Sequence, residues 1–323
     1  MTEVNPSTVM MLTHWFDPTA DWVVDELNKR KVPVFRCDAA EFPQRLTLSA
    51  ELTNGRMTGT FRTEHRIVDI EEICGIYYRR PTMFEFPETM SDPERQWSTR
   101  EARLGFGGVL AAMRGWLNHP HDIVRADYKP FQLRIAAHSG LTIPRTLISN
   151  DPKTVHNFAK QVGYVAYKPM SSGGIQEDGQ HKALYANKLS AEECDDPTIV
   201  HTAHMFQEWV LSDHAVRLTY VDGRCFAAAI HAHSDATRID WRSDYAALSY
   251  ENVIVPSRVQ QSVLDMMKRL NLRFGALDFL VRPDGQWIFL EVNPNGQWAW
   301  IEELAPVIAA AIADALTKEN STL

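Results

Sequence analysis

The sequence contains little cysteine, and its cysteines form no pattern typical of a disulfide framework or a zinc site. Four occur in 323 residues, without CxxC spacing and without a histidine at zinc-finger distance. Disulfide-dependent secreted domains are much richer in cysteine, whereas scattered single thiols are typical of reducing compartments. We therefore predict a cytoplasmic protein with four reduced thiols, which are Cys37, Cys74, Cys194 and Cys225.

Long apolar runs and an excess of positive charge are also absent. No run approaches the roughly 20 apolar residues of a transmembrane helix. Residues 9–12 follow Glu3 and are too few for the apolar core of a signal peptide, so we expect none. The formal net charge of −8 argues against general affinity for nucleic acid or anionic membranes. We expect neither as a partner.

Two common nucleotide-binding motifs are missing too. The sequence has no GxxxxGKS or GxxxxGKT, so it is not a P-loop protein, and no GxGxxG follows the first predicted strand. Internal repeats and low-complexity tracts are likewise absent. With 45% hydrophobic and 23% charged residues, the composition is that of an ordinary globular protein with two or three domains.

Strand and helix patterns alternate in the N-terminal part. Residues 8–13 are apolar, and Asp17 followed by Pro18 is a typical helix start. The Asn54-Gly55 pair predicts a hairpin turn further along. These patterns predict an α/β (α+β) fold whose first domain is a small α/β unit covering residues 1–118.

The remaining chain divides into two predicted parts. Residues 119–205 mix helices with short strands, and residues 206–323 predict a mostly antiparallel sheet. Helices are expected over residues 256–270 and about 300–317.

The segment 274–298, FGALDFLVRPDGQWIFLEVNPNGQW, is the most informative in the sequence. Two apolar runs flank a Pro-Asp-Gly turn, which predicts a β-hairpin. If Asp284 and Gly285 form a two-residue loop, Asp278 lies directly opposite Glu291. Such pairs have Cβ atoms roughly 5 Å apart.

The hairpin brings oxygen ligands together. Asn293 lies two residues beyond Glu291 and so projects from the same face as Glu291 and Asp278. Two carboxylates on apolar strands repel each other, and a divalent cation offsets that repulsion. Few oxygen ligands without histidine or cysteine suit Mg²⁺. The alternative is a solvent-facing polar stripe; we favour the metal site.

Two lysines and a small-residue loop have the chemistry of a phosphate site. Lys168 ends the apolar strand YVAYK, and Lys129 lies in a predicted helix. A loop of small residues offers backbone N–H groups to phosphates, and its glycines, with Gly179, suit a mobile lid. Snorkelling lysines and a plain flexible loop are the alternatives. The loop residues are Ser171, Ser172, Gly173 and Gly174.

A polar pair within an apolar strand is a candidate base-binding segment. The strand QEWV comprises Gln207, Glu208, Trp209 and Val210. Its backbone groups suit an adenine, and either Glu208 or Asp213 suits ribose hydroxyls. An ordinary alternating strand is the alternative.

Two arginines are placed to bind an anion. Arg217 lies in a strand with Val216 and Leu218, and Arg242 follows in IDWRSD. A guanidinium in such a strand binds a phosphoryl group or an acyl phosphate, or else a neighbouring acid in a salt bridge.

In this order, the residues resemble the ATP-grasp superfamily. The resemblance covers roughly residues 119–316, and the N-terminal unit resembles the family's pre-ATP-grasp domain. It implies a central subdomain over 119–205 and a C-terminal subdomain with a metal hairpin over 206–323. The matching residues are Lys129, Lys168 with its loop, QEWV, Arg217, Asp278, Glu291 and Asn293.

Within the superfamily the chain is most similar to the maturases of graspetides, the microviridin-type omega-ester peptides. The similarity rests on YYRRP at 77–81, residues 119–149, IDWR at 239–242 and NPNGQWAWIEE at 293–303. It implies an ADP-forming ligase that activates Asp or Glu side chains of a ribosomal precursor peptide and closes ester or amide rings. That precursor has a leader and a core with Thr, Ser or Lys as nucleophiles.

The resemblance also implies a role for each site residue. Lys129 and Lys168 bind the triphosphate of ATP, residues 208–210 contact adenine, and the hairpin residues hold two Mg²⁺ ions. Arg217, Arg242 and Lys168 serve catalysis at the reacting carboxylate.

Several points stay open at this stage. Ester and amide products are not distinguished, and a homodimer is compatible with the sequence. His231, His233 and Asp240 are candidates for a general base. A ligase of free amino acids or of a protein C-terminus is one alternative function, and a non-catalytic nucleotide-binding protein is another.

Overall fold

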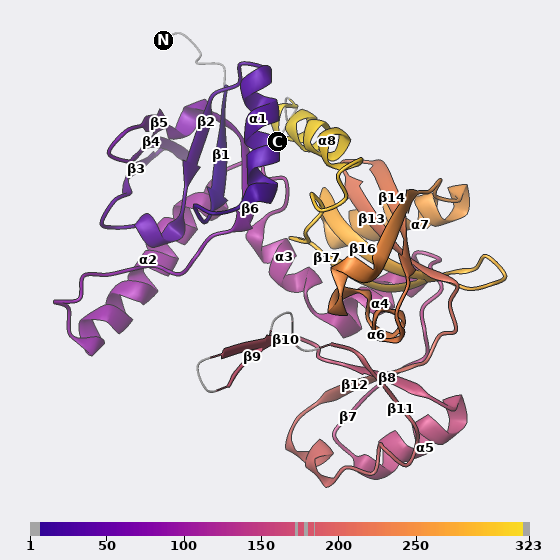
Figure 1. The fold of residues 1–323 in the computed structure, drawn as a ribbon. Coiled ribbons are helices and arrows are strands. Elements are labelled where there is room, and N and C mark those ends of the chain that lie inside the picture. Colours follow the sequence, from indigo (N-terminus) through magenta and orange to yellow (C-terminus); the bar gives the residue numbers. More distant parts are fainter. Residues whose placement is uncertain (1–6, 172–173, 178–179, 184, 319–323) are drawn as a thin grey trace.

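The computed structural model describes residues 7–171, 174–177, 180–183 and 185–318. They form three groups of elements (Figure 1), which we call the N-terminal, central and C-terminal units.

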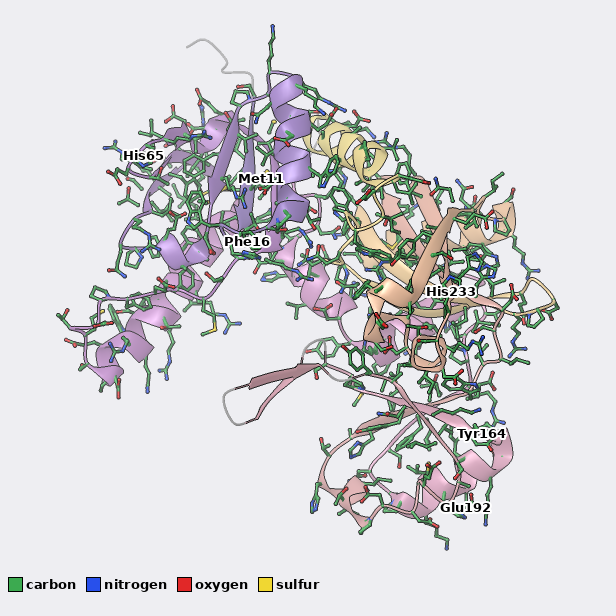
Figure 2. All side chains as sticks on the ribbon, in the orientation of Figure 1. Met11, Phe16, His65, Tyr164, Glu192 and His233 are labelled. Atoms are coloured by element: carbon green, nitrogen blue, oxygen red, sulfur yellow. The ribbon has the colours of Figure 1, made fainter. Side chains whose placement is uncertain are left out.

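The N-terminal unit contains two three-stranded sheets, a parallel one in the order β2-β1-β6 and an antiparallel one in the order β3-β4-β5. Figure 2 shows Met11 inside this unit and His65 at its surface. The elements are β1 (Thr8–Thr13), α1 (Pro18–Lys29), β2 (Val34–Cys37), η1 (Ala39–Glu41), β3 (Thr47–Thr53), β4 (Arg56–Arg62), β5 (Ile67–Asp69), η2 (Ile70–Glu72), β6 (Ile73–Arg80) and α2 (Asp92–Ala112).

Local signals in this unit are confirmed. Asp17 caps α1: one carboxylate oxygen accepts from the N–H of Ala20 at 3.2 Å, and the other accepts from the Thr13 hydroxyl at 2.7 Å. Asn54 and Gly55 adopt φ of 52° and 77°, as a two-residue hairpin turn between β3 and β4 requires.

The central unit is a four-stranded sheet in the order β11-β8-β12-β7, with the separate hairpin β9–β10 beside it. Two helices, α3 and α4, precede this sheet in the chain and pack against the C-terminal unit, where α4 contacts α7 and β17 (Figure 1). The elements are α3 (Pro120–Ala126), α4 (Lys129–His138), β7 (Thr146–Ser149), α5 (Pro152–Val162), β8 (Val165–Lys168), β9 (Gly174–Glu177), β10 (Gln180–Ala183), β11 (Asn187–Leu189), η3 (Pro197–His201) and β12 (His204–Glu208).

The C-terminal unit is an antiparallel five-stranded sheet in the order β15-β14-β13-β16-β17. Its final helix, α8, begins at Ala305, somewhat later than expected. The elements are β13 (His214–Val221), β14 (Arg224–Ala232), α6 (Asp235–Ile239), η4 (Trp241–Ser243), η5 (Tyr245–Ala247), β15 (Leu248–Asn252), α7 (Ser257–Leu270), β16 (Phe274–Val281), β17 (Trp287–Asn293) and α8 (Ala305–Thr317).

The two faces of the C-terminal sheet have different environments. Leu218, Leu277 and Val292 lie on one face and pack in an apolar cluster with residues of α7 and α4. Because successive strand residues alternate in direction, Arg217 and Asp278 project from the opposite face. One face therefore packs on α4 and α7. The other carries these polar side chains and, further along the strands, Val221 and Phe274, which belong to an apolar cluster with residues of α8.

The last helix of the chain joins its first domain. α8 packs beside α1 (Figure 1), and Ile308 and Ile312 share an apolar cluster with Val23, Leu27 and Tyr77. The N-terminal and C-terminal units thus have a common core.

Two further global features concern helices and thiols. No helix in the described part of the chain combines the length and apolarity needed to cross a membrane. The four cysteines are free, as the sequence predicts.

The hairpin turn between β16 and β17 differs from the prediction. Arg282 and Gln286 pair through a backbone hydrogen bond of 2.9 Å, and Gly285, at φ 83°, closes a three-residue loop. The predicted two-residue loop is therefore wrong. A bulge at Leu290 adds one residue to β17, and beyond it the predicted pairing is restored.

Candidate active site

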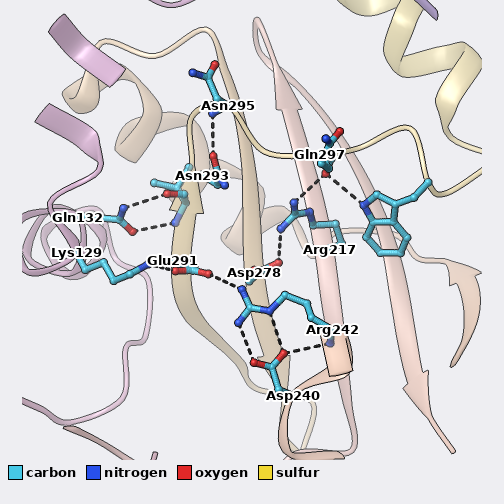
Figure 3. Close-up of polar contacts among 12 residues, drawn as sticks. Lys129, Gln132, Arg217, Asp240, Arg242, Asp278, Glu291, Asn293, Asn295 and Gln297 are labelled. Atoms are coloured by element: carbon cyan, nitrogen blue, oxygen red, sulfur yellow. Dashed lines mark hydrogen bonds and ion pairs between the residues drawn. The ribbon is translucent and has the colours of Figure 1, made fainter. Parts of the chain in front are cut away.

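Asp278 and Glu291 are direct cross-strand partners, as predicted, on the polar face of the C-terminal sheet. Asp278 is buried and accepts from Arg217 Nη1 at 2.7 Å (Figure 3). Arg217 is in register with Asp278 across β13 and β16, which aligns this pair. The sequence prediction left a phosphoryl group and a salt bridge as alternative partners of Arg217, and the ligand-free chain has the salt bridge.

Glu291 lies among cations from three elements. Lys129, the first residue of α4, forms an ion pair with it, and Arg242 Nη1 lies 3.5 Å from Glu291 Oε1 (Figure 3). Burial acts to raise the pKa of Glu291, but Lys129, Lys168 and Arg242 outweigh burial and lower it to about 2. The carboxylate is therefore ionised and ready to bind a cation.

Lys168 is brought from the central unit to the same place. It ends β8, and burial lowers its pKa, with Lys129 and Arg242 adding to that effect and Glu291 opposing it. Lys168 is partly exposed, and an anionic ligand would stabilise its ammonium group beside the other two cations.

These side chains surround a cavity of about 360 Å³ between the central and C-terminal units. Its lining includes Asp127, Ser171 and Asn293 beside the lysines and Glu291. Asn293 Oδ1 already accepts from the N–H of Asn295 at 2.9 Å, which orients the amide. The described residues contain no cluster of three or more His, Cys, Asp or Glu side chains suited to a metal; the predicted set has two carboxylates and one amide.

The predicted lid is only partly described. Ser171 is exposed at the cavity, and Gly174 begins β9. Ser172, Gly173 and Gly179 lie outside the described residues.

The predicted adenine segment lines a second, adjoining cavity, together with Asp278 and Glu291. Gln207 is buried, and its side-chain Oε1 has no hydrogen-bond partner in the described structure, as a site for a donor ligand requires. The N–H groups of Glu208 and Trp209 donate to backbone carbonyls, at 2.9 and 2.8 Å, and are not free for a base. Val210 also lines this cavity.

Position separates the two ribose candidates. Glu208 lines the cavity and lies 3.5 Å from Arg282, whereas Asp213 pairs with His214 at 2.9 Å away from the lining residues. This placement favours Glu208. The cavity holds only about 90 Å³, well below the roughly 300–1,000 Å³ of ligand sites. As it stands, this cavity is too small for a nucleoside.

The same geometry shows which of Arg242 and the general-base candidates lie close to the carboxylates. Asp240 holds Arg242 in a two-point ion pair, with distances of 2.9 Å to Nε and 3.1 Å to Nη2. Ala228 is the β14 partner of Arg217, and His231 lies three positions beyond Ala228. His231 therefore projects from the opposite face of the sheet. His233 lies just past the end of β14, and its Nε2 is engaged with the Ser249 hydroxyl at 2.8 Å. Neither histidine is placed to act as a base at the carboxylates.

Gln132 is a functional residue that sequence reasoning missed. From α4 it donates to Val292 O at 3.0 Å and accepts from Val292 N at 3.0 Å, so it binds the edge of β17 as another strand would. This contact places Lys129 beside Glu291. The sequence feature that could have indicated this role is a polar residue on the apolar face of a helix.

Arg79 is the second missed residue. It is buried and donates to Asn295 O at 2.5 Å and to the side chain of Gln297, which also accepts from Thr19. The backbone oxygen of Gln297 in turn accepts from Arg217 Nη2 at 2.8 Å. The N-terminal unit thus holds the loop that orients Arg217. The sequence feature that could have indicated the role of Arg79 is the double arginine at the end of an apolar strand.

Comparison with known proteins agrees with this geometry. Residues 8–124 match the family model of the MvdD pre-ATP grasp domain. Over 98% of this chain and 100% of the other, the structure is similar to a Chryseobacterium gregarium RiPP-associated ATP-grasp ligase in complex with ADP and a leader and core peptide, with a TM-score of 0.89 and 25% identity. The chain thus has a pre-ATP-grasp region and is similar over nearly its whole length to a RiPP-associated ATP-grasp ligase. Its fold class is therefore as predicted.

Two other ATP-grasp structures, from Microcystis aeruginosa MRC, are also similar. The macrocyclase MdnC, bound with precursor peptide MdnA, has 27% identity and a TM-score of 0.82, over 96% of this chain and 98% of the other. The macrocyclase MdnB has 28% identity and a TM-score of 0.79, over 96% and 99%. No curated protein matches this ATP-grasp chain.

Proposed function

We propose that this chain is an ATP-dependent ligase that activates Asp or Glu side chains of a ribosomal precursor peptide and closes side-chain ester or amide macrocycles. The observation that carries the proposal is the pairing of Asp278 and Glu291 close to four cations, beside two adjoining cavities between the central and C-terminal units. Similarity over nearly the whole chain to peptide ligases supports the same reaction. A cytoplasmic location, supported by four free cysteines, is part of the proposal.

The donor set fits ATP and Mg²⁺. Asp278, Glu291 and Asn293 would hold two Mg²⁺ ions, which neutralise phosphate charge when bound. Lys129 and Lys168 would then exchange Glu291 for phosphate oxygens. Residues 207–210 would contact the nucleoside, with Glu208 at the ribose. Lys129 and Arg217 form ion pairs with the same two carboxylates, Glu291 and Asp278.

The reaction proceeds in two steps at this site. A peptide carboxylate, held by Arg217 and Arg242, attacks the γ-phosphorus of ATP; the bond from γ-phosphorus to the bridging oxygen breaks and ADP leaves. Lys168 stabilises the negative charge that builds up. A hydroxyl or amine of the same peptide then attacks the acyl carbon, phosphate leaves, and the proton of the nucleophile passes to solvent or phosphate. Closure of the units excludes water that would hydrolyse the acyl phosphate.

Intact-mass spectrometry tests the proposal. The substrate is a short peptide encoded beside the gene and rich in Thr, Asp and Glu, incubated with the protein, ATP and Mg²⁺. Loss of one water per ring, dependent on ATP, supports a macrocyclase, and mild alkaline hydrolysis separates esters from amides. An unchanged peptide mass with continuing ADP formation contradicts it and favours a ligase of free amino acids or of a protein C-terminus.

A matched pair of substitutions assigns the reaction to the hairpin. Asp278→Ala should abolish product formation, because it removes a carboxylate of the metal set. Asp284→Ala lies in the exposed turn of the same hairpin and should keep wild-type turnover. Wild-type turnover in Asp278→Ala would refute the metal assignment. Absence of ADP in the wild type with every acceptor would favour a non-catalytic nucleotide-binding protein.

A further inference from the structure

Asp240 is a buried carboxylate that binds two units of the molecule at once. One oxygen accepts from Arg242 Nε at 2.9 Å and from the Arg242 backbone N–H at 3.1 Å. The other accepts from Arg242 Nη2 at 3.1 Å and from the backbone N–H of Ala186 at 3.1 Å. Arg242 belongs to the C-terminal unit, and Ala186 belongs to the central unit. One side chain therefore joins the guanidinium to the segment across the cavity (Figure 3 shows the Arg242 contacts).

These contacts exceed what a helix cap requires. Asp240 does cap η4 through the Arg242 N–H. Asp244 caps η5 through Ala246 N at 3.0 Å from an exposed position, with no ion pair among the described residues. Capping explains one hydrogen bond of Asp240 and leaves the other three unexplained. The side chain is only 6% exposed, so those three bonds decide whether a buried charge is tolerated.

The contacts of Arg242 indicate what this arrangement does. Held by Asp240, its Nη1 lies 3.5 Å from Glu291 Oε1, beside the carboxylate pair. A free arginine has many rotamers, and fixing its planar head at two points removes most of that freedom. The guanidinium is thus held ready for an anion before one arrives.

We infer that Asp240 is a positioning residue that aligns Arg242 with the reacting carboxylate only while the segment 185–187 of the central unit closes on the C-terminal unit. This inference rests on the proposed function. Opening the nucleoside cavity separates Ala186 from Asp240, and the carboxylate loses one of its four donors. Arg242 is then held less firmly. Closure and alignment of the arginine therefore occur together, so the acyl phosphate forms in a site already closed to water.

This role replaces that of a general base. Although burial acts to raise its pKa, the ion pair with Arg242 and the N–H of Ala186 hold the pKa of Asp240 below its ordinary value. A carboxylate with four donors and a lowered pKa is a weak proton acceptor.

A double-mutant cycle tests the inference with full-length protein, ATP, Mg²⁺ and the precursor peptide. The variants are Asp240→Asn, Arg242→Lys and the double substitution, with Asp244→Asn as the matched control in the same segment. Asp240→Asn should lower kcat by about tenfold while the ATP Kd stays within about twofold, because alignment and not nucleotide binding is lost. The double variant should be no slower than Arg242→Lys alone, and Asp244→Asn should match the wild type.

Hydrogen exchange of residues 185–187 gives a readout without turnover. Asp240→Asn should accelerate exchange there, relative to the wild type and to Asp244→Asn, because the Ala186 N–H loses its charged acceptor. Multiplicative effects in the cycle, a wild-type rate in Asp240→Asn, or unchanged exchange would each overturn the inference. If the wild type forms no cyclised peptide, the proposed function fails, and exchange alone still decides whether Asp240 tethers the central unit.

Discussion

Arg217 donates to Asp278 at 2.7 Å and, through its second terminal nitrogen, to the backbone oxygen of Gln297 at 2.8 Å. A predicted carboxylate-binding arginine is thus the ion-pair partner of a predicted metal ligand. The backbone contact with Gln297 fixes the second terminal nitrogen of the same guanidinium.

Breaking this buried pair should be costly. Arg217→Ala leaves the Asp278 carboxylate buried without its cation, and we expect the free energy of unfolding to fall by about 3–5 kcal/mol. Asp278→Asn in the same chain should recover part of the loss, because the unpaired charge disappears. Urea denaturation of both single variants and the double variant measures the coupling. Strict additivity would show that the pair does not act as a unit.

The lowered pKa of Glu291 makes stability depend on acid. Its pKa is about 2 in the folded chain against 4.5 for the free group, so the unfolded chain binds the proton more readily between these values. The stabilisation is complete above about pH 4.5 and is lost as the pH falls toward 2. In the Glu291→Gln variant the unfolding free energy should vary less with pH over this window. Equal slopes in urea denaturation series of both proteins would contradict this.

We expect Gln132 to contribute more to stability and to ATP affinity than its position on a helix suggests. Gln132→Leu removes both hydrogen bonds to Val292 and one to Ala126 O, and we expect a loss of about 2–4 kcal/mol in stability. Because α4 also carries Lys129, ATP affinity should fall in the same variant. Calorimetry of unfolding and of ATP binding measures both effects.

Gln161 provides the control for that substitution. It lies on α5 at the surface, where its side chain accepts from Arg145 at 3.0 Å. Gln161→Leu should change stability by less than about 0.5 kcal/mol and leave ATP affinity unchanged. Similar losses in the two variants would show that the contact with Val292 has no special role.

Substitution of Arg79 tests whether the N-terminal unit influences the position of Arg217 in the active site. Arg79→Lys keeps the charge but cannot reach Asn295 O and the Gln297 side chain together, so the loop that orients Arg217 loosens. We expect kcat for precursor cyclisation to fall by about tenfold with little change in ATP affinity. Arg80→Lys, at the exposed neighbouring position, should retain wild-type kinetics. Equal kinetics in Arg79→Lys and Arg80→Lys would contradict an influence of the N-terminal unit on Arg217.

The hairpin shows how a correct cross-strand pair can follow from a partly incorrect expectation. A two-residue loop predicts that Asp278 faces Glu291, and the actual loop has three residues. Leu290 bulges out of β17 and restores the pairing. Turn residues indicate a hairpin, but a bulge depends on how both strands twist against their neighbours. Local patterns therefore located the turn but not its length.

By itself, the amino-acid sequence determined the features that depend on local spacing. These are the cap at Asp17, the Asn54-Gly55 turn, the strands around residue 284 and the pairing of Asp278 with Glu291. Their physics involves residues a few positions apart, so a linear pattern contains it.

Only the tertiary structure decided which distant groups meet. Gln132 binds the edge of β17, Arg79 holds the loop of Gln297, and Asp240 joins Arg242 to Ala186. Each contact satisfies a buried polar group whose partner lies in another unit. Such partners are set by the order of strands and the packing of units, which no local pattern specifies.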